Sequence, residues 1–524
     1  MTELTGEHFI GAKRRKSADK FYAANPALNE AIEPAISQAT ADDVECAAMA
    51  AADAAEAYER IGADRRAQFL DAISEHILGL GETLLQRAHE ETGLPLARLE
   101  GERGRTVGQL KLMAAEARDG VWMSLRVDPA LPDRKPAPRS DLRMRKKALG
   151  PVAIFGASNF PLAFSVAGGD AASALAAGCP IVVKAHPAHP GVSELIATAI
   201  IRAAEETGMP EGVFSLLQGN THEAGQALVA DPRIKAVGFT GSRQGGLALM
   251  KIAAARETPI PVYAEMSAIN PVILLPGALK ERAPDLGQAF VASLTLGAGQ
   301  FCTNPGLVIA LAGPELDAFA AAAEAAIDET AQQVMLTSSI CESYKSGVEA
   351  LTSQDGIAAH LPAPASARNC CAPALFRTTA ARFAGNHALQ KEVFGPASVI
   401  VACETHEEIA ALLTKLEGQL TISIHCTEDD ASRAAALLPL MEEKAGRIVA
   451  NGWPTGVEVC HAMVHGGPFP ATSDGRTTSV GTLSIERFVR PICYQDFPAQ
   501  LLPPVLRDDM LPAAPHRHDG KWRF

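Results

Sequence analysis

Short apolar runs alternate with alanine-rich helical segments after Gly150, and this alternation limits the folds open to the chain more than any other feature. Such alternation is typical of β-α-β units, so we expect an open parallel sheet. The apolar runs lie at 152–155, 181–183, 213–217 and 236–239, with helical patterns near 161–177, 191–207, 221–230 and 243–255. Ligands of these sheets bind at the carboxyl ends of the strands, which points to the turns at 156–160, 184–187, 218–220 and 240–245.

The regions on either side predict further elements. Residues 40–118 predict helices from the spacing of their apolar side chains. Residues 270–447 repeat the α/β pattern, with strands expected at 272–275, 307–311, 397–401 and 421–425. The stretch 121–147 is rich in proline, lysine and arginine, and its run LRMRKKA suits an exposed or edge strand. We expect this stretch to be a linker or an arm that pairs with another element.

Charge and composition exclude several functions. The chain has 524 residues, with 60 acidic and 47 basic side chains and a formal net charge of −13. No stripe of lysine and arginine alternates with aromatic residues, so neither nucleic acid nor an anionic membrane surface is an expected partner. No apolar stretch reaches the ~18 residues of a membrane span, and the amino terminus has no secretory signal. We therefore expect a soluble, cytoplasmic protein.

Ten cysteines are scattered along the chain without a CxxC pair, so neither a zinc knuckle nor a redox pair is expected. Cys302 differs from the others because the glycines and the proline of GAGQFCTNPG exclude a helix interior. Its thiol should lie on a tight connection before the strand at 307–311, and loops of this kind present nucleophiles. From the residues alone, Cys302 is either a buried small hydrophobe or a nucleophile.

Four further features stand at the ends of expected strands. Glu265 is either a strand-end side chain that reaches water or a desolvated general base. The segment GFTGSRQGG, residues 238–246, is either an ordinary turn or a phosphate cradle at a helix amino terminus. Asn159 is either a turn residue or an amide donor to an oxyanion. Lys184 is either a surface residue or a cation that binds hydroxyl or phosphate groups.

These residues, in this order and spacing, resemble the aldehyde dehydrogenase superfamily from about residue 20 to 500. The matching motifs are GASNFP around Asn159, VVKAHP around Lys184, GFTGS at 238–242, Glu265 with Asn270-Pro271, GQFCT around Cys302 and KEVFGP at 391–396. The resemblance implies an α/β fold with two open parallel-sheet domains and a β oligomerisation arm. It implies a dinucleotide-binding domain at 1–124 and 149–266, a catalytic domain at 267–484 and the arm at 125–148 and 485–505. Exposed arm strands should pair with a neighbour in a homodimer or homotetramer.

The resemblance also implies the catalytic cycle of an NAD(P)-dependent aldehyde dehydrogenase. The Cys302 thiolate attacks the aldehyde carbon, and the Asn159 amide and the backbone N–H of Cys302 hold the oxyanion. Hydride passes to the nicotinamide, after which water attacks the thioester and Glu265 accepts its proton. The presence of Cys302 and Glu265 disfavours a structural relative without activity, and Glu265 disfavours acyl transfer to coenzyme A.

For the cofactor, the resemblance implies that Lys184 binds the adenosine ribose, that Gly241 and Ser242 lie near the pyrophosphate, and that Glu392 and Phe394 lie at the nicotinamide ribose. Its other implied cofactor positions are Phe155, Ser158, His186, Pro187, Gly219 and Phe239. Many NAD-preferring relatives have a glutamate where this chain has Pro187. Because no carboxylate there repels a 2′-phosphate, we expect NADP to serve as well as or better than NAD.

The run that begins at Asn451 is similar to one branch of the superfamily. That branch contains bacterial 2,5-dioxopentanoate (α-ketoglutarate semialdehyde) dehydrogenases and an NADP-linked fatty aldehyde dehydrogenase. The first substrate needs polar partners for its carboxylate, and the second needs an apolar tunnel. We expect the dioxo acid, with a medium- or long-chain fatty aldehyde as the alternative. The implied substrate residues are Phe160, Phe301, Thr303 and Trp453, with Arg105, Gln109 and Lys111 as candidate polar partners.

His461 and His465, in the same run, have a spacing that could suggest a metal site. The glycines and prolines around them argue against the helix that such a site would need, and no third ligand is apparent. We therefore expect no metal and assign both histidines to packing around the substrate entrance.

Overall fold

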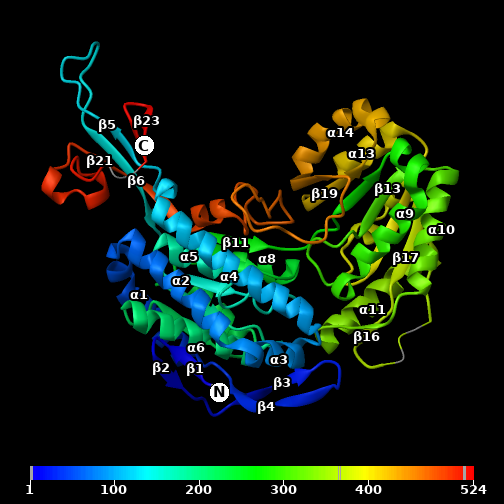
Figure 1. The fold of residues 1–524 in the computed structure, drawn as a ribbon, viewed down its shortest axis with the longest axis horizontal. Helices are drawn as coiled ribbons and strands as arrows, with labels where there is room; N and C mark the ends of the chain where they lie inside the picture. The colour runs from blue at the N-terminus through cyan, green and yellow to red at the C-terminus, as the bar shows by residue number, and fades with distance from the viewer. Residues whose placement is uncertain (1–3, 364, 366, 512–514) are drawn as a thin grey trace.

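The computed structural model describes residues 4–363, 365, 367–511 and 515–524, and two large sheets dominate it (Figure 1). The alternating runs after Gly150 form neighbouring parallel strands of the first sheet, as the sequence predicts. Two amino-terminal strands extend this sheet in the antiparallel direction. The strand order is β11 (Val262–Glu265), β10 (Ala236–Thr240), β7 (Val152–Phe155), β8 (Ile181–Lys184), β9 (Phe214–Leu217), β1 (His8–Ile10) and β2 (Lys13–Arg15).

Helices cover both faces of the first sheet, because successive strand residues point to opposite sides. In β7, Val152 and Ile154 pack into one apolar core, whereas Ala153 packs into another. The first core is completed by α2 (Ala63–Gly79), α3 (Gly81–Thr92), α4 (Leu96–Asp119), α5 (Gly169–Ala177) and α6 (Pro190–Thr207). The second is completed by α1 (Ala41–Arg60), α7 (Glu223–Ala230) and α8 (Arg243–Ala254).

The second sheet is built in the same way and includes all four strands expected between 270 and 447. Its order is β15 (Ala358–His360), β17 (Ala374–Thr379), β18 (Ala397–Cys403), β13 (Leu307–Leu311), β12 (Pro271–Leu274), β19 (Gln419–His425) and β20 (Ala445–Ala450), with only β15 antiparallel. One face packs against α9 (Pro276–Thr295) and α10 (Pro314–Asp328). The other packs against α11 (Ser338–Thr352), α12 (Ala380–Gly385), α13 (His406–Lys415) and α14 (Ala431–Lys444).

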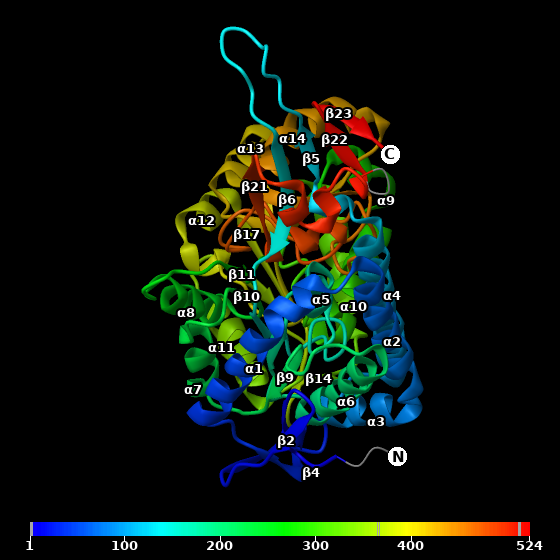
Figure 2. The ribbon, with the colours of Figure 1, turned by 90° about the vertical axis from the view of Figure 1, so that its left-hand side faces the viewer.

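A third sheet joins segments that are far apart in the sequence. Its order is β21 (Val489–Gln495), β6 (Leu142–Ala148), β5 (Arg126–Asp128), β22 (His516–His518) and β23 (Lys521–Arg523). The LRMRKKA run is β6, and the β5–β6 connection projects from the molecule in both views (Figures 1 and 2). The carboxyl-terminal pair β22 and β23 was not expected from the sequence. Two short strand pairs, β3 (Lys20–Asn25) with β4 (Glu30–Ser37) and β14 (Gln333–Val334) with β16 (Cys370–Cys371), complete the strands.

One expected helix is shorter than its sequence pattern. The pattern at 161–177 yields α5 only from Gly169, because residues 157–168 form a compact loop. The backbone N–H of Ala157 donates to the Phe164 carbonyl at 2.8 Å, and a Cβ on Gly168 would lie 2.6 Å from the Ala163 carbonyl oxygen. The loop therefore needs the glycine, and it carries Asn159 at the carboxyl end of β7. Among the described residues, no helix is long and apolar enough to span a bilayer.

Candidate active site

Cys302 lies between the short 3-10 helix Leu296–Gly299 and β13, on the tight connection that the sequence predicts. Asn270 holds this connection in place: its Nδ2 donates to the carbonyl oxygens of Cys302 at 2.8 Å and Asn304 at 3.1 Å. Its Oδ1 accepts from the backbone N–H of Thr421 at 3.2 Å. Asn270 is fully buried with φ of 44°, a conformation that asparagine tolerates better than most residues. The thiol is thus carried by a constrained loop.

Glu265 is the last residue of β11, and its side chain is buried. Ser479 Oγ donates to its Oε2 at 2.8 Å, and its Oε1 lies 2.8 Å from His465 Nε2. Burial by itself raises the pKa of Glu265, but His465 and the hydrogen bonds with Ser479 and Cys302 together outweigh it and hold the pKa below its ordinary value. Glu265 is therefore an anion at neutral pH and has the charge that a general base requires.

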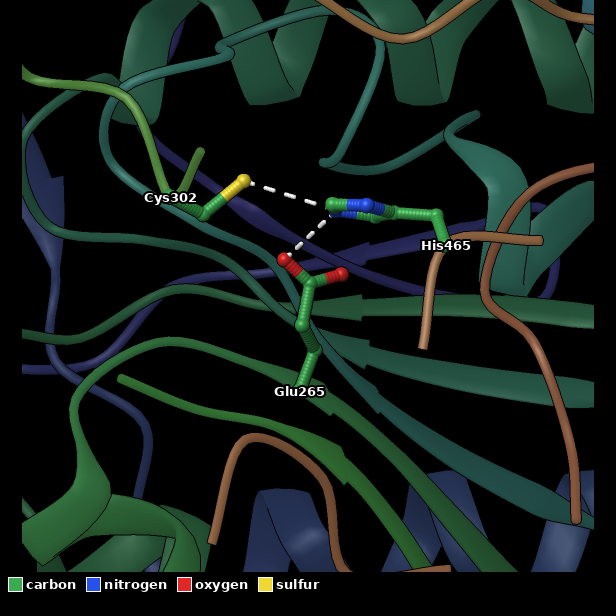
Figure 3. A group of neighbouring side chains, drawn as sticks. All are labelled: Glu265, Cys302 and His465. Atoms are coloured by element: carbon green, nitrogen blue, oxygen red, sulfur yellow. Dashed lines mark hydrogen bonds and ion pairs between the residues drawn. The ribbon is translucent and has the colours of Figure 1, made fainter. Parts of the chain in front are cut away.

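His465 lies between the two reactive side chains (Figure 3). Its Nε2 is 3.4 Å from Cys302 Sγ as well as 2.8 Å from the Glu265 carboxylate, and its side chain is 1% exposed. The assignment of His465 to packing at the substrate entrance is therefore wrong, whereas His461 is exposed. The reason is long-range: the segment after Asn451 folds over the end of β11, where Thr472 forms a bridge with Glu265. No local pattern signals such a contact.

The hydrogen bonds of His465 indicate which ring nitrogen carries a proton. Nε2 faces a carboxylate oxygen and a sulfur, both of which accept hydrogen bonds, while Nδ1 is buried without a partner among the described residues. The network is satisfied best by an N–H on Nε2 that is shared between Glu265 and Cys302. This N–H stabilises negative charge on either neighbour.

The thiol of Cys302 is not activated by its surroundings alone. Burial raises its pKa well above the ordinary value, the negative charge of Glu265 raises it further, and Arg105 acts in the opposite direction. The sulfur therefore carries its proton at neutral pH unless a neighbour accepts it. The reactive atoms of Cys302, His465 and Glu265 all lie within 4.8 Å of one another, so the Glu265 carboxylate is close enough to serve as that acceptor.

Asn159 is oriented by two hydrogen bonds. Its side-chain Nδ2 donates to the Gln300 carbonyl at 2.9 Å, and its backbone carbonyl oxygen accepts from Arg98 at 2.9 Å. An amide nitrogen has two N–H groups, so one remains for a ligand. Asn159 lines the same cleft as Cys302 and Glu265.

That cleft has a volume of about 750 Å³ and extends from the reactive residues to the amino terminus of α8. Ser242 caps α8 by accepting a hydrogen bond from the Gly245 N–H at 3.2 Å, which leaves free N–H groups for an anion. Burial raises the pKa of Glu392 to about 8, so this side chain lies in a desolvated place. The cleft fits an extended dinucleotide. The predicted residues along it are Ser158, Asn159, His186, Pro187, Gly241, Ser242, Glu265, Cys302, Glu392 and Phe394.

The other predicted cofactor residues do not line the cleft; they are Phe155, Lys184, Gly219 and Phe239. The rings of Phe155 and Phe239 pack 6.4 Å apart, and a Cβ on Gly241 would meet the Phe239 ring at 2.8 Å. Lys184 Nζ donates to the carbonyl oxygens of Ala185 at 2.9 Å and Gly219 at 2.6 Å. Burial lowers the pKa of Lys184 to about 8.

The predicted substrate residues divide into two groups. Phe160 and Phe301 pack edge to face at 5.3 Å in an apolar cluster with Phe164, and Thr303 is buried one residue after Cys302. Trp453 instead packs against Phe290 and His425. None of these four predicted substrate residues lines the cleft described above.

The chain belongs to the aldehyde dehydrogenase family, whose sequence model matches residues 13–479. It is an NAD(P)-dependent enzyme that oxidises an aldehyde. It is 54% identical over 522 residues to alpha-ketoglutaric semialdehyde dehydrogenase 2 of Azospirillum brasilense, covering 99% of each chain. It is 47% identical over 511 residues to the alpha-ketoglutaric semialdehyde dehydrogenase of Acinetobacter baylyi, covering 97% of each chain.

Solved structures share the fold. The betaine aldehyde dehydrogenase of Staphylococcus aureus in complex with NAD+ superposes with a TM-score of 0.81 at 20% identity, over 94% of this chain and 96% of that one. Aldehyde dehydrogenase 21 of Physcomitrella patens, in complex with the reaction product succinate, gives a TM-score of 0.79 at 21% identity, over 93% and 97%. The expected fold, two parallel-sheet units with an additional β-sheet, is thus confirmed.

Proposed function

We propose that this enzyme oxidises 2,5-dioxopentanoate, the α-ketoglutarate semialdehyde, to 2-oxoglutarate. The observation that carries this proposal is 54% identity, over nearly the full length, to a relative named for that aldehyde. A fatty aldehyde dehydrogenase remains the alternative, because the aromatic cluster of Phe160, Phe164 and Phe301 would also accept an alkyl chain.

In the proposed mechanism, Cys302 is the nucleophile. The Glu265 carboxylate accepts the thiol proton, and the His465 N–H stabilises the resulting thiolate. The sulfur attacks the aldehyde carbon, and the Asn159 amide and the backbone N–H of Cys302 donate to the oxyanion of the thiohemiacetal. The nicotinamide ring of the bound cofactor supplies the hydride acceptor for this intermediate.

Hydrolysis of the thioester completes the proposed cycle. Glu265 releases the first proton to the solvent of the cleft and is again a carboxylate. It then accepts a proton from the attacking water, whose oxygen bonds to the acyl carbon while the Cys302 sulfur leaves. His465 restrains the carboxylate throughout, since it contacts Oε1 while Ser479 contacts Oε2.

The cleft supports a proposed set of cofactor-binding residues. We propose the α8 amino terminus with Gly241 and Ser242 for the pyrophosphate, Lys184 with His186 for the adenosine ribose, and Glu392 with Phe394 for the nicotinamide ribose. The remaining cofactor positions expected from the sequence, Phe155, Ser158, Pro187, Gly219 and Phe239, belong to the same proposal. Because Pro187 in the cleft carries no charge, NADP should serve as well as or better than NAD.

We also propose the expected domain roles: cofactor binding by 1–124 and 149–266, catalysis by 267–484, and oligomerisation by 125–148 and 485–505. The exposed strand β23 lies at the edge of the third sheet with the large apolar side chains of Trp522 and Phe524. An unpaired edge of this kind favours pairing with a second copy in a homodimer or homotetramer. A cytoplasmic location accords with the free cysteines among the described residues.

Steady-state kinetics with four combinations of substrate and cofactor test the proposal. The wild-type enzyme should show a kcat/KM for 2,5-dioxopentanoate at least about tenfold above that for hexanal, with either NAD or NADP. A hexanal value tenfold larger would favour the fatty aldehyde alternative. Formation of an acyl-coenzyme A product on addition of coenzyme A would contradict hydrolysis.

A further inference from the structure

One face of α4 packs against the loop that carries Asn159. Arg98, Glu102, Arg105 and Gln109 follow at helical spacing along this face. The Glu102 carboxylate accepts from the backbone N–H groups of Leu162 at 2.8 Å and Ala163 at 3.0 Å. These two hydrogen bonds fix the helix against residues 157–168, next to the reactive centre.

Arg105 lies over the aromatic cluster beside that centre. Its guanidinium carbon is 5.0 Å from the Phe164 ring centroid and 5.7 Å from that of Phe160. The Phe164 ring is in turn 6.1 Å from the ring of His465, which contacts the Cys302 thiol. Burial lowers the pKa of Arg105, while negative charge on Cys302, Glu102, Glu265 and Glu458 acts in the opposite direction. The cation therefore shares the desolvated region of the reactive residues.

Arg105 has no ion pair within 4 Å among the described residues, unlike its neighbours on α4. Arg98 donates to the Asn159 carbonyl and lies 3.9 Å from Glu102, and Lys111 pairs with Glu75 at 3.2 Å on the exposed side. For Arg105, by contrast, only ring contacts are found within the described part of the chain. One turn further along α4, Gln109 is 4% exposed and its Nε2 is buried without an acceptor.

A partly buried guanidinium and a buried amide without acceptors, one turn apart, form an incomplete site for an anion. Buried donors are normally paired, so unpaired donors beside a reactive centre point to a ligand. The guanidinium fork matches a carboxylate in two parallel hydrogen bonds. We propose that Arg105 binds the distal carboxylate of the aldehyde substrate, with the Gln109 amide as a second donor. This inference rests on the proposed function and names the residues that select its substrate.

The proposed site also explains how a fatty aldehyde would be rejected. The carbon chain of 2,5-dioxopentanoate spans about 5 Å between its carboxylate and its aldehyde carbon. Its methylene groups would contact Phe160 and Phe164, while its carboxylate pairs with Arg105. An aldehyde without a carboxylate would contact the same two rings but leave the Arg105 guanidinium without an anion. Discrimination would then come from an unpaired buried cation rather than from the shape of the cluster.

The first test compares two aldehydes of equal chain length, 2,5-dioxopentanoate and pentanal. In Arg105→Gln, kcat/KM for the dioxo acid should fall by about 10- to 100-fold, mainly through KM, and that for pentanal by a much smaller factor. Arg105→Lys should recover part of the loss. Arg118→Gln, which removes an exposed cation at the carboxyl-terminal end of the same helix, is the matched control and should leave the substrate ratio unchanged. Equal losses for both aldehydes in Arg105→Gln would overturn the proposal.

Inhibition by glutarate separates failure of this inference from failure of the proposed function. Glutarate should inhibit pentanal oxidation by the wild-type enzyme, and its inhibition constant should rise by about tenfold or more in Arg105→Gln. If the wild-type enzyme prefers pentanal but glutarate inhibition depends on Arg105, the substrate is wrong and the anion site stands. If the wild-type enzyme prefers the dioxo acid and Arg105→Gln changes neither the substrate ratio nor glutarate inhibition, only the role of Arg105 is contradicted. Unchanged melting temperatures exclude misfolding as the cause.

Discussion

His465 Nε2 lies 2.8 Å from the carboxylate of Glu265, although the two residues are 200 positions apart in the sequence. The same nitrogen lies 3.4 Å from the Cys302 sulfur. The proposed general base, Glu265, and the proposed nucleophile, Cys302, are therefore linked by one imidazole N–H, which stabilises negative charge on each.

Removal of this link should impair both half-reactions. In His465→Leu, kcat should fall by about 10²-fold, because Glu265 loses one restraint and the thiolate loses its N–H donor. Alkylation of Cys302 by iodoacetamide should also require a higher pH, since the thiolate is less stable without the donor. The control is His461→Leu, which changes an exposed histidine of the same run. A His465→Leu enzyme with an unaltered alkylation profile would show that the imidazole does not act on the sulfur.

Loss of the general base should separate the two half-reactions. Glu265→Gln should still give a burst of reduced cofactor of about one equivalent per active site, formed more slowly than in the wild type because the thiol proton must pass to solvent. Turnover after the burst should be reduced by about 10²- to 10⁴-fold. Stopped-flow absorbance of the reduced cofactor measures the burst and the steady rate. Glu257→Gln, at an exposed site, serves as the control. Normal steady turnover in Glu265→Gln would remove Glu265 from deacylation.

The hydrogen bond from Ser479 should appear in the pH profile. Ser479 helps to hold the pKa of Glu265 below its ordinary value, so Ser479→Ala should raise that pKa. Since Glu265 must be ionised, activity in the variant should be lost at a higher pH as the solution is acidified. The acidic limb of kcat against pH measures this shift, and a limb that stays in place would contradict it.

Asn270 should matter for stability as well as for activity. Asn270→Ala removes four side-chain hydrogen bonds and retains a positive φ, so the free energy of unfolding should fall by about 2–4 kcal/mol. Asn270→Gly accepts the positive φ and should be less destabilised than Asn270→Ala. Urea unfolding of both variants gives the comparison. Equal stabilities would assign the whole effect to the hydrogen bonds rather than to the backbone conformation.

Cofactor choice should respond to charge at Pro187. Pro187→Glu places a carboxylate where the proposal puts the adenosine ribose, so kcat/KM for NADP should fall by about 10- to 100-fold through repulsion of the 2′-phosphate. The value for NAD should change little or improve. Pro187→Gln controls for loss of the proline. A fall of equal size for both cofactors would place residue 187 away from the 2′ position.

The amino-acid sequence by itself determined the parallel-sheet architecture, because the alternation of apolar runs and helical segments is a local property. It also placed Glu265, Asn159 and the α8 amino terminus at the ends of strands, where parallel sheets bring side chains together. The glycine and proline turns around Cys302 were sufficient to place the thiol on a connection rather than in a helix.

Other features were decided only by tertiary structure. His465 reaches the reactive centre because a loop without regular local pattern folds across β11, and β22 joins the third sheet through pairing with a strand almost 400 residues earlier. Arg105 and Lys111 are both cationic side chains of α4. Arg105 lies over buried aromatic rings, whereas Lys111 pairs with Glu75 on the exposed side of the helix. Which cation is desolvated depends on what packs against each face of α4, and long-range packing has no signature in local sequence.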